Sequence, residues 1–322
     1  MRLTLHRNLQ LLRGAAFATA CTFAVVCQAP PSAAEEGGLI TPADVAPPAA
    51  SSPPPAGSLE IGAGSTSAMP APPAAKVAKK DEPRTDEPMD SATEFFEKKV
   101  FSVPDGKGKT ITYFFKPPAP YQPKDKLYPL VLVLHDEDGL APAAQYLIQK
   151  AARKTFPAYI AVPVLAPGRI WAFPAKMDDK KLDRDAKKPQ ELDDILKLVS
   201  DLADEYATLD INRIYVVGCG QGAFGVFGAA AKYSQVFAGG VPISGGWALK
   251  DAGKLTRVPM FVMAGAEDKE IDPGVSQNLA YYIQQSGGKR ISFMAIPGME
   301  HDCANPYLYN NAVWAWLFKQ RK

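Results

Sequence analysis

The chain has 322 residues, of which 47% are hydrophobic and 22% charged, and its formal net charge is +2. This composition excludes a fully disordered chain, a collagen-like repeat and a protein with many membrane spans. A net charge so close to zero gives no reason to expect nucleic acid as a partner.

Residues 1–34 predict a signal peptide. Three arginines accompany an apolar run over 14–27, which is shorter than the roughly 20 residues that a membrane-spanning helix needs. The small residues Ser32-Ala33-Ala34 suit cleavage. Lipidation at Cys21 or Cys27 and an uncleaved anchor are the alternatives, but neither cysteine has a good lipobox. We expect export to the periplasm, the cell surface or the medium, where disulfides persist, with no membrane span after cleavage.

Residues 35–92 predict a disordered linker. The segment is rich in Pro, Ala, Ser and Gly, and no Phe, Tyr or Trp occurs between Ala24 and Glu94. Without large apolar side chains a segment cannot bury enough surface to offset its conformational entropy. We therefore expect the folded domain over 93–322, a length that suffices for one large core.

The rest of the chain alternates between strand and helix patterns. Continuous apolar runs such as 130–134 are typical of strands buried on both faces, and 191–206 has clear amphipathic helical spacing. We expect strands at 99–103, 110–115, 130–134, 159–164, 213–217, 239–243, 258–263 and 290–296, and helices at 141–154, 191–206, 223–232, 275–285 and 312–319. This alternation predicts an α/β fold whose mostly parallel central sheet has helices on both faces.

Polar or glycine-rich motifs follow four of these strands, at the edge where open α/β sheets place their sites. They are His135-Asp136-Glu137-Asp138, Gly218-Cys219-Gly220-Gln221-Gly222, Gly265-Ala266-Glu267-Asp268 and Pro297-Gly298-Met299-Glu300-His301. A glycine-rich elbow between strand and helix, then an acid loop, then a histidine loop, is the order of an α/β-hydrolase.

On these motifs, and on Tyr128-Pro129-Leu130-Val131 and 210–218, the chain resembles the α/β-hydrolase superfamily over 113–317. The resemblance is to the carboxylesterase, feruloyl-esterase and prolyl-oligopeptidase-like branch. It implies hydrolysis of carboxylic esters through an acyl-enzyme on serine, without a cofactor. It also implies that Asp268 is the acid, that His301 is the base, and that His135 belongs to the oxyanion loop.

The chain departs from that pattern in two places. Gly220 stands where Gly-x-Ser-x-Gly has the nucleophilic serine, and glycine has no side chain that attacks. Asp136 follows the oxyanion-loop histidine where the family has glycine, and its carboxylate opposes negative charge in the oxyanion hole near Gln221. We therefore expect an impaired esterase homologue, a pseudoenzyme that binds a ligand or a protein partner in the old cleft. The alternative is an active ester hydrolase that uses water or the Cys219 thiol with His301 and Asp268.

The resemblance also implies a disulfide. Relatives of the tannase and feruloyl-esterase type join a cysteine beside the nucleophile to one beside the histidine. Here these positions correspond to Cys219 and Cys303, although the second is displaced by one residue from the family's pattern. We therefore expect a Cys219–Cys303 disulfide, or at least a close approach of the two side chains.

Two readings from other classes fit the same residues less well. The elbow satisfies the dinucleotide pattern G-x-G-x-x-[GA] over 218–223, but no acidic residue lies between Ile211 and Lys250 to hold a ribose. The carboxylates of 136–138 could ligate a hard cation such as Ca²⁺, but three adjacent carboxylates are more often a solvated loop. We expect neither a cofactor nor a metal, and a small-molecule ester or another ligand in the cleft.

Overall fold

The computed structural model describes residues 96–118, 125–136, 139, 141–178, 182 and 187–322. The predicted signal peptide and linker therefore lie outside the described residues, as do Glu137 and Asp138. In the part of the chain that is described, no helix is long and apolar enough to cross a membrane.

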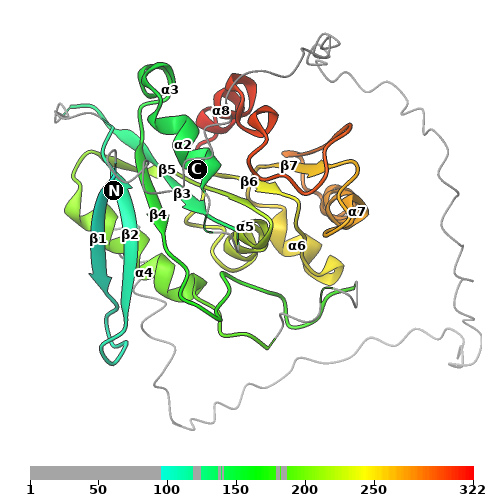
Figure 1. The fold of residues 1–322 in the computed structure, drawn as a ribbon, viewed down its shortest axis with the longest axis horizontal. Helices are drawn as coiled ribbons and strands as arrows, with labels where there is room; N and C mark the ends of the chain where they lie inside the picture. Colours follow the sequence, from blue (N-terminus) through cyan, green and yellow to red (C-terminus); the bar gives the residue numbers. More distant parts are fainter. Residues whose placement is uncertain (1–95, 119–124, 137–138, 140, 179–181, 183–186) are drawn as a thin grey trace, which may run out of the picture. The chain divides into compact units, whose positions relative to one another are not determined.

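The described residues build one sheet of eight strands in the order β1-β2-β4-β3-β5-β6-β7-β8 (Figure 1). Strands β1 and β2 are antiparallel to their neighbours, whereas β4, β3, β5, β6, β7 and β8 run parallel to one another. The strands are β1 (Glu97–Ser102), β2 (Thr110–Lys116), β3 (Tyr128–Leu134), β4 (Tyr159–Pro163), β5 (Leu209–Cys219), β6 (Gly239–Ile243), β7 (Met260–Gly265) and β8 (Ile291–Ile296). The predicted mostly parallel sheet is confirmed, and the carboxyl ends of its six parallel strands share one edge.

Helices cover both faces of this sheet. They are α2 (Pro142–Ile148), α3 (Lys150–Thr155), α4 (Leu192–Glu205), α5 (Gln221–Lys232), α6 (Ala252–Leu255), α7 (Pro273–Gln285) and α8 (Asn311–Phe318). One buried cluster joins the sheet to α4, α5, α6 and α7, and a second joins its other face to α2, to Phe156 at the end of α3, and to α8. Along β3, Leu130 and Leu132 enter the first cluster and Val131 and Val133 enter the second. Because both faces of β3 are buried, its sequence is a continuous apolar run.

The structure divides the helix predicted over 141–154. Gln149 is extended, with φ −58° and ψ 141°, and separates α2 from α3. A tertiary contact holds α3 in its place, since the Arg153 guanidinium donates to the carbonyl oxygens of Pro117 and Pro118, at 2.7 Å each. The side chains around Gln149 have good helix propensity, so the sequence pattern carries no sign of this break.

Candidate active site

A single residue, Gly220, turns the chain from β5 into α5. Its φ of 54° and ψ of −119° lie in a region that side-chain-bearing residues rarely adopt. The neighbouring glycines are needed for space, because a Cβ on Gly218 would overlap the backbone of Gly222, and a Cβ on Gly222 would overlap the carbonyl oxygen of Leu134. The three glycines together permit the tight strand-to-helix turn that the sequence predicts.

The carboxylate of Asp136 occupies the space beside this turn. A Cβ placed on Gly220 would overlap all three carboxylate atoms of Asp136. The Asp136 Oδ1 atom also accepts a hydrogen bond of 2.8 Å from the backbone N–H of Gln221, the residue that follows the turn. The carboxylate therefore lies where the side chain of a residue at position 220 would project, and it engages the first N–H group of α5.

His301 lies between Asp136 and a second carboxylate. Its Nδ1 is 2.8 Å from Asp268 Oδ2, and its Nε2 is 3.3 Å from Asp136 Oδ2. Asp268 follows β7 and is buried, and its Oδ1 accepts 2.9 Å hydrogen bonds from the backbone N–H groups of Glu270 and Ile271. His301 follows β8, so two neighbouring strands of the sheet deliver the pair. The arrangement is a row of three side chains: Asp268, His301 and Asp136.

The two carboxylates hold the imidazole in its charged form. The hydrogen bond with Asp136, opposed by burial and reinforced by the hydrogen bond with Asp268, raises the pKa of His301 to about 9. At neutral pH the ring is therefore an imidazolium that donates from both nitrogens. An imidazolium has no lone pair for a proton, so this protonation state opposes the general-base role that the sequence predicts for His301.

This arrangement predicts a pH-dependent stability. The pKa of His301 is about 9 in the folded chain, above the ordinary value near 6.5 of an unfolded histidine. The contribution of the His301 ion pairs to the stability of the folded chain is therefore fully present below about pH 6.5, and it is lost as pH rises through about 9. We expect NMR titration to place the His301 pKa near 9, and Asp136→Asn to lower it. Denaturant unfolding should show the free energy of unfolding falling over the same window in the native chain but not in His301→Gln.

Titration of His301 near pH 6.5 in the native chain would contradict the prediction.

His135 supports the loop that presents Asp136. Its Nε2 accepts a 3.1 Å hydrogen bond from the backbone N–H of Leu165, so the proton is on Nδ1, which donates to the carbonyl oxygen of Asp136 at 2.6 Å. The ring is buried and packs edge-on against Trp171, whose indole N–H donates to the His135 carbonyl. The geometry gives His135 the task of fixing the backbone at the end of β3.

The predicted disulfide is present. Cys219 and Cys303 are bonded, with their Cα atoms 5.8 Å apart. The bond joins the end of β5 to the loop that carries His301. Because a disulfide sulfur has no proton and no thiolate, the alternative in which the Cys219 thiol attacks an ester is wrong for this form of the chain.

Neither a metal nor a dinucleotide fits the described site. Atoms of Asp136, His301 and Cys303 lie within 4.8 Å of one another, as a metal would require. The sulfur of Cys303 is in the disulfide, however, and cannot act as a thiolate ligand, which leaves two ligands. The glycine-rich turn over 218–223 is filled by the Asp136 carboxylate, whose charge would repel a pyrophosphate.

Among the described residues, the structure brings together those that the resemblance assigns to the site. Asp136, Gly220, Gln221, Asp268, His301 and the Cys219–Cys303 bond form one cluster, and His135 lies behind it. Their catalytic roles stay predictions. The Asp136 carboxylate lies beside the Gln221 N–H group, near where the oxyanion hole is expected. The sequence carries no sign that the same carboxylate also fills the space next to Gly220 and contacts His301.

An elbow after β5, an acid after β7 and a histidine after β8, on a mostly parallel sheet covered on both faces, define the α/β-hydrolase fold. Within this class, the family model for phospholipases and carboxylesterases matches residues 122–310, and the chain belongs to that family. No curated protein matches the chain in sequence.

Solved structures agree on the fold. A thermostable esterase superposes with a TM-score of 0.62 and 23% identity over 71% of this chain and 64% of that one. The acylaminoacyl peptidase of Pyrococcus horikoshii superposes with a TM-score of 0.53 and 13% identity, over 71% of this chain and 42% of that one. A putative dienelactone hydrolase from Klebsiella pneumoniae superposes with a TM-score of 0.52 and 16% identity, over 70% of this chain and 99% of that one. The chain thus spans less than two thirds of the first two structures. At these identities the likeness shows the fold alone.

Proposed function

We propose that this chain is an exported member of the carboxylesterase family that has lost ester hydrolysis and retains a cleft for a ligand or a protein partner. The observation that carries the proposal is the Asp136 carboxylate beside Gly220, hydrogen-bonded to the Gln221 N–H group and to His301. This one side chain affects the nucleophile, the oxyanion hole and the base.

The nucleophile and the oxyanion hole are both compromised. Gly220 has no hydroxyl, and the space that a serine side chain needs is filled. The N–H group of Gln221, which would stabilise a tetrahedral oxyanion, already donates to Asp136 Oδ1. Loss of one such donor typically costs about 10²- to 10³-fold in rate, and a carboxylate at that position repels the developing charge as well. Loss of the nucleophile leaves at most the small residual rate of binding and oxyanion stabilisation.

The remaining route to hydrolysis uses water activated by His301. The raised pKa opposes this route, because the imidazolium must first lose a proton that both Asp136 and Asp268 stabilise. The site is not sealed, however, since the side chains of Asp136 and His301 keep 18% and 11% of their surface exposed. A site that a ligand can reach, but that lacks a competent base and nucleophile, is consistent with binding as the function.

Export belongs to the same proposal. The basic and apolar features of 1–34 support it, and the Cys219–Cys303 disulfide suits an oxidising compartment outside the cytoplasm.

The proposal is tested by hydrolysis of p-nitrophenyl acetate and p-nitrophenyl butyrate by the purified chain beside His301→Ala. We expect the native chain to be no faster than His301→Ala, since surface side chains alone cause the background reaction with such activated esters. Turnover by the native chain that disappears in His301→Ala would refute the loss of hydrolysis and support the water route.

A further inference from the structure

Cationic side chains gather on one side of the sheet's amino edge, opposite the edge that holds Asp136 and His301. They come from the end of β2, the start of β3, the helix α3 and the end of α8, on the face that α2, α3 and α8 cover. We call this surface the basic face; its residues are Lys116, Lys126, Lys150, Arg153, Lys154 and Lys319. In Figure 1, α2, α3 and α8 lie close together, and an aromatic contact between Phe156 and Phe318 joins the ends of α3 and α8.

The charge of the basic face is not neutralised by described carboxylates. Helices α2, α3 and α8 contain no Asp or Glu. Among the described residues, no carboxylate forms an ion pair with the six cations, although Asp125 lies next to Lys126 in sequence. Arg213 differs, since its guanidinium pairs with Asp210 at 2.8 Å. The net charge of +2 therefore conceals a local excess of positive charge.

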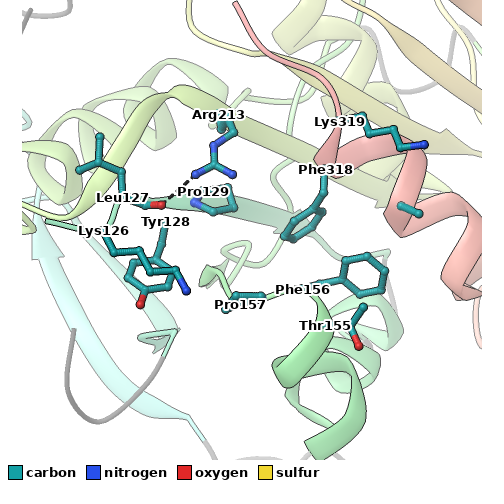
Figure 2. A pocket seen from close by; sticks show the side chains of 11 residues that line it. Lys126, Leu127, Tyr128, Pro129, Thr155, Phe156, Pro157, Arg213, Phe318 and Lys319 are labelled. Atoms are coloured by element: carbon teal, nitrogen blue, oxygen red, sulfur yellow. Dashed lines mark hydrogen bonds between the residues drawn. The ribbon is translucent and has the colours of Figure 1, made fainter. Parts of the chain in front are cut away.

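A hollow of about 380 Å³ lies at one end of the basic face (Figure 2). The rings of Phe156 and Phe318 lie side by side along it, with centroids 5.2 Å apart, and Pro157 lies next to them. Across the hollow, the ammonium of Lys126 lies 5.1 Å from the centre of the Tyr128 ring. The hollow thus has an apolar floor and a cationic rim.

A second hollow, of about 530 Å³, is lined by residues of α2, of α3 and of the end of β2. It is lined by three cations of the basic face, by one aliphatic side chain and by two carboxamides: Lys116, Lys150, Arg153, Ile148, Gln145 and Gln149. Carboxamides both donate and accept hydrogen bonds, as hydroxyl groups require, whereas ammonium and guanidinium groups bind carboxylates. This hollow is therefore suited to a ligand with both hydroxyls and carboxylates.

We propose that the basic face binds an acidic polysaccharide, a chain of uronate sugars that lies across α3 and enters both hollows. Uronate carboxylates would meet the lysines, and hydroxyls would meet Gln145 and Gln149. The apolar face of a sugar ring would lie on the half-buried side chains of Pro157 and Phe318. Two concave sites suit a chain better than a planar bilayer.

The test measures binding of a fluorescent polygalacturonate oligomer to the full chain, at about 20 mM and about 500 mM salt. The variant Lys126→Gln/Lys150→Gln/Lys319→Gln removes three charges from the basic face. The control Lys197→Gln/Lys232→Gln/Lys250→Gln removes three charges from the other side of the sheet, in α4, in α5 and in the turn before α6. We expect binding that weakens with salt, that falls at least about tenfold in the first variant and that changes less than about twofold in the control, since the contacts are local.

Several outcomes would overturn the proposal: no binding at low salt, equal losses in the two triple variants, or equal binding of fully methyl-esterified polygalacturonate, which has the same backbone without the charge. Tighter binding of an oligothymidylate or of anionic lipid vesicles would replace the polysaccharide by another partner. Thermal unfolding of both variants would check that the exposed substitutions leave the fold intact. None of these outcomes depends on the state of the Asp136 site.

Discussion

The double variant Asp136→Gly/Gly220→Ser is expected to hydrolyse p-nitrophenyl butyrate, whereas each single variant is expected to stay inactive. Gly220→Ser alone places its Cβ on the Asp136 carboxylate, and Asp136→Gly alone frees the Gln221 N–H group without supplying a nucleophile. The double variant restores both parts, and loss of the Asp136 hydrogen bond lowers the pKa of His301 toward the range of a general base. We expect its kcat/KM to exceed that of either single variant by at least about 10²-fold, the scale of one oxyanion donor.

The decisive feature is the strong non-additivity of the two substitutions. Adding His301→Ala to the double variant should abolish the gained activity, which would show that the new serine uses this histidine. A serine at φ 54° carries strain of about 1–3 kcal/mol, so the unfolding free energy of each variant should be measured beside its activity. If Gly220→Ser alone were as active as the double variant, the Asp136 carboxylate would not obstruct position 220.

Removal of the disulfide is expected to lower the free energy of unfolding by about 4.5 kcal/mol. Cys219 and Cys303 are 84 residues apart in sequence, and the chain-entropy model for a loop of this length gives a stabilisation close to that value. The paired variant Cys219→Ala/Cys303→Ala is preferable to serine, because both positions are buried. Guanidinium unfolding of this variant and of the native chain under reducing conditions should agree, since both lack the same bond. A loss below about 1 kcal/mol would show that the bond constrains the unfolded chain little.

Much of the fold is visible in the sequence because its signals are local and repeated. The runs at 130–134 and 239–243 have the continuous apolar pattern of strands that helices cover on both faces, and both are strands in the structure. Once the strands are parallel, their carboxyl ends must meet. The proximity of Asp268 and His301 then follows from their places after β7 and β8. The expectations for residues 1–92 stay predictions.

The parts that the sequence does not reveal depend on contacts between distant segments. The break at Gln149 accompanies the bonds of Arg153 to the carbonyls of Pro117 and Pro118. Likewise, the position of the Asp136 carboxylate depends on the path of the chain after β3 and on the missing side chain of Gly220. In the sequence, Asp136 and Gly220 are two separate departures from the hydrolase pattern. In the structure they are complementary in volume, since one supplies the atoms for which the other leaves room.

This complementarity bears on how such a site evolves. A chain with serine at 220 and glycine at 136 would reach the present pair by one of two single-substitution intermediates. One has serine at 220 beside aspartate at 136 and is crowded; the other has glycine at both positions and has no nucleophile. Return would pass through the same two intermediates. Neither intermediate combines a nucleophile with a free N–H group, so selection for hydrolysis cannot reward the first step in reverse. Under the proposed loss of hydrolysis, the overlap of Asp136 with position 220 would make that loss hard to reverse by single substitutions.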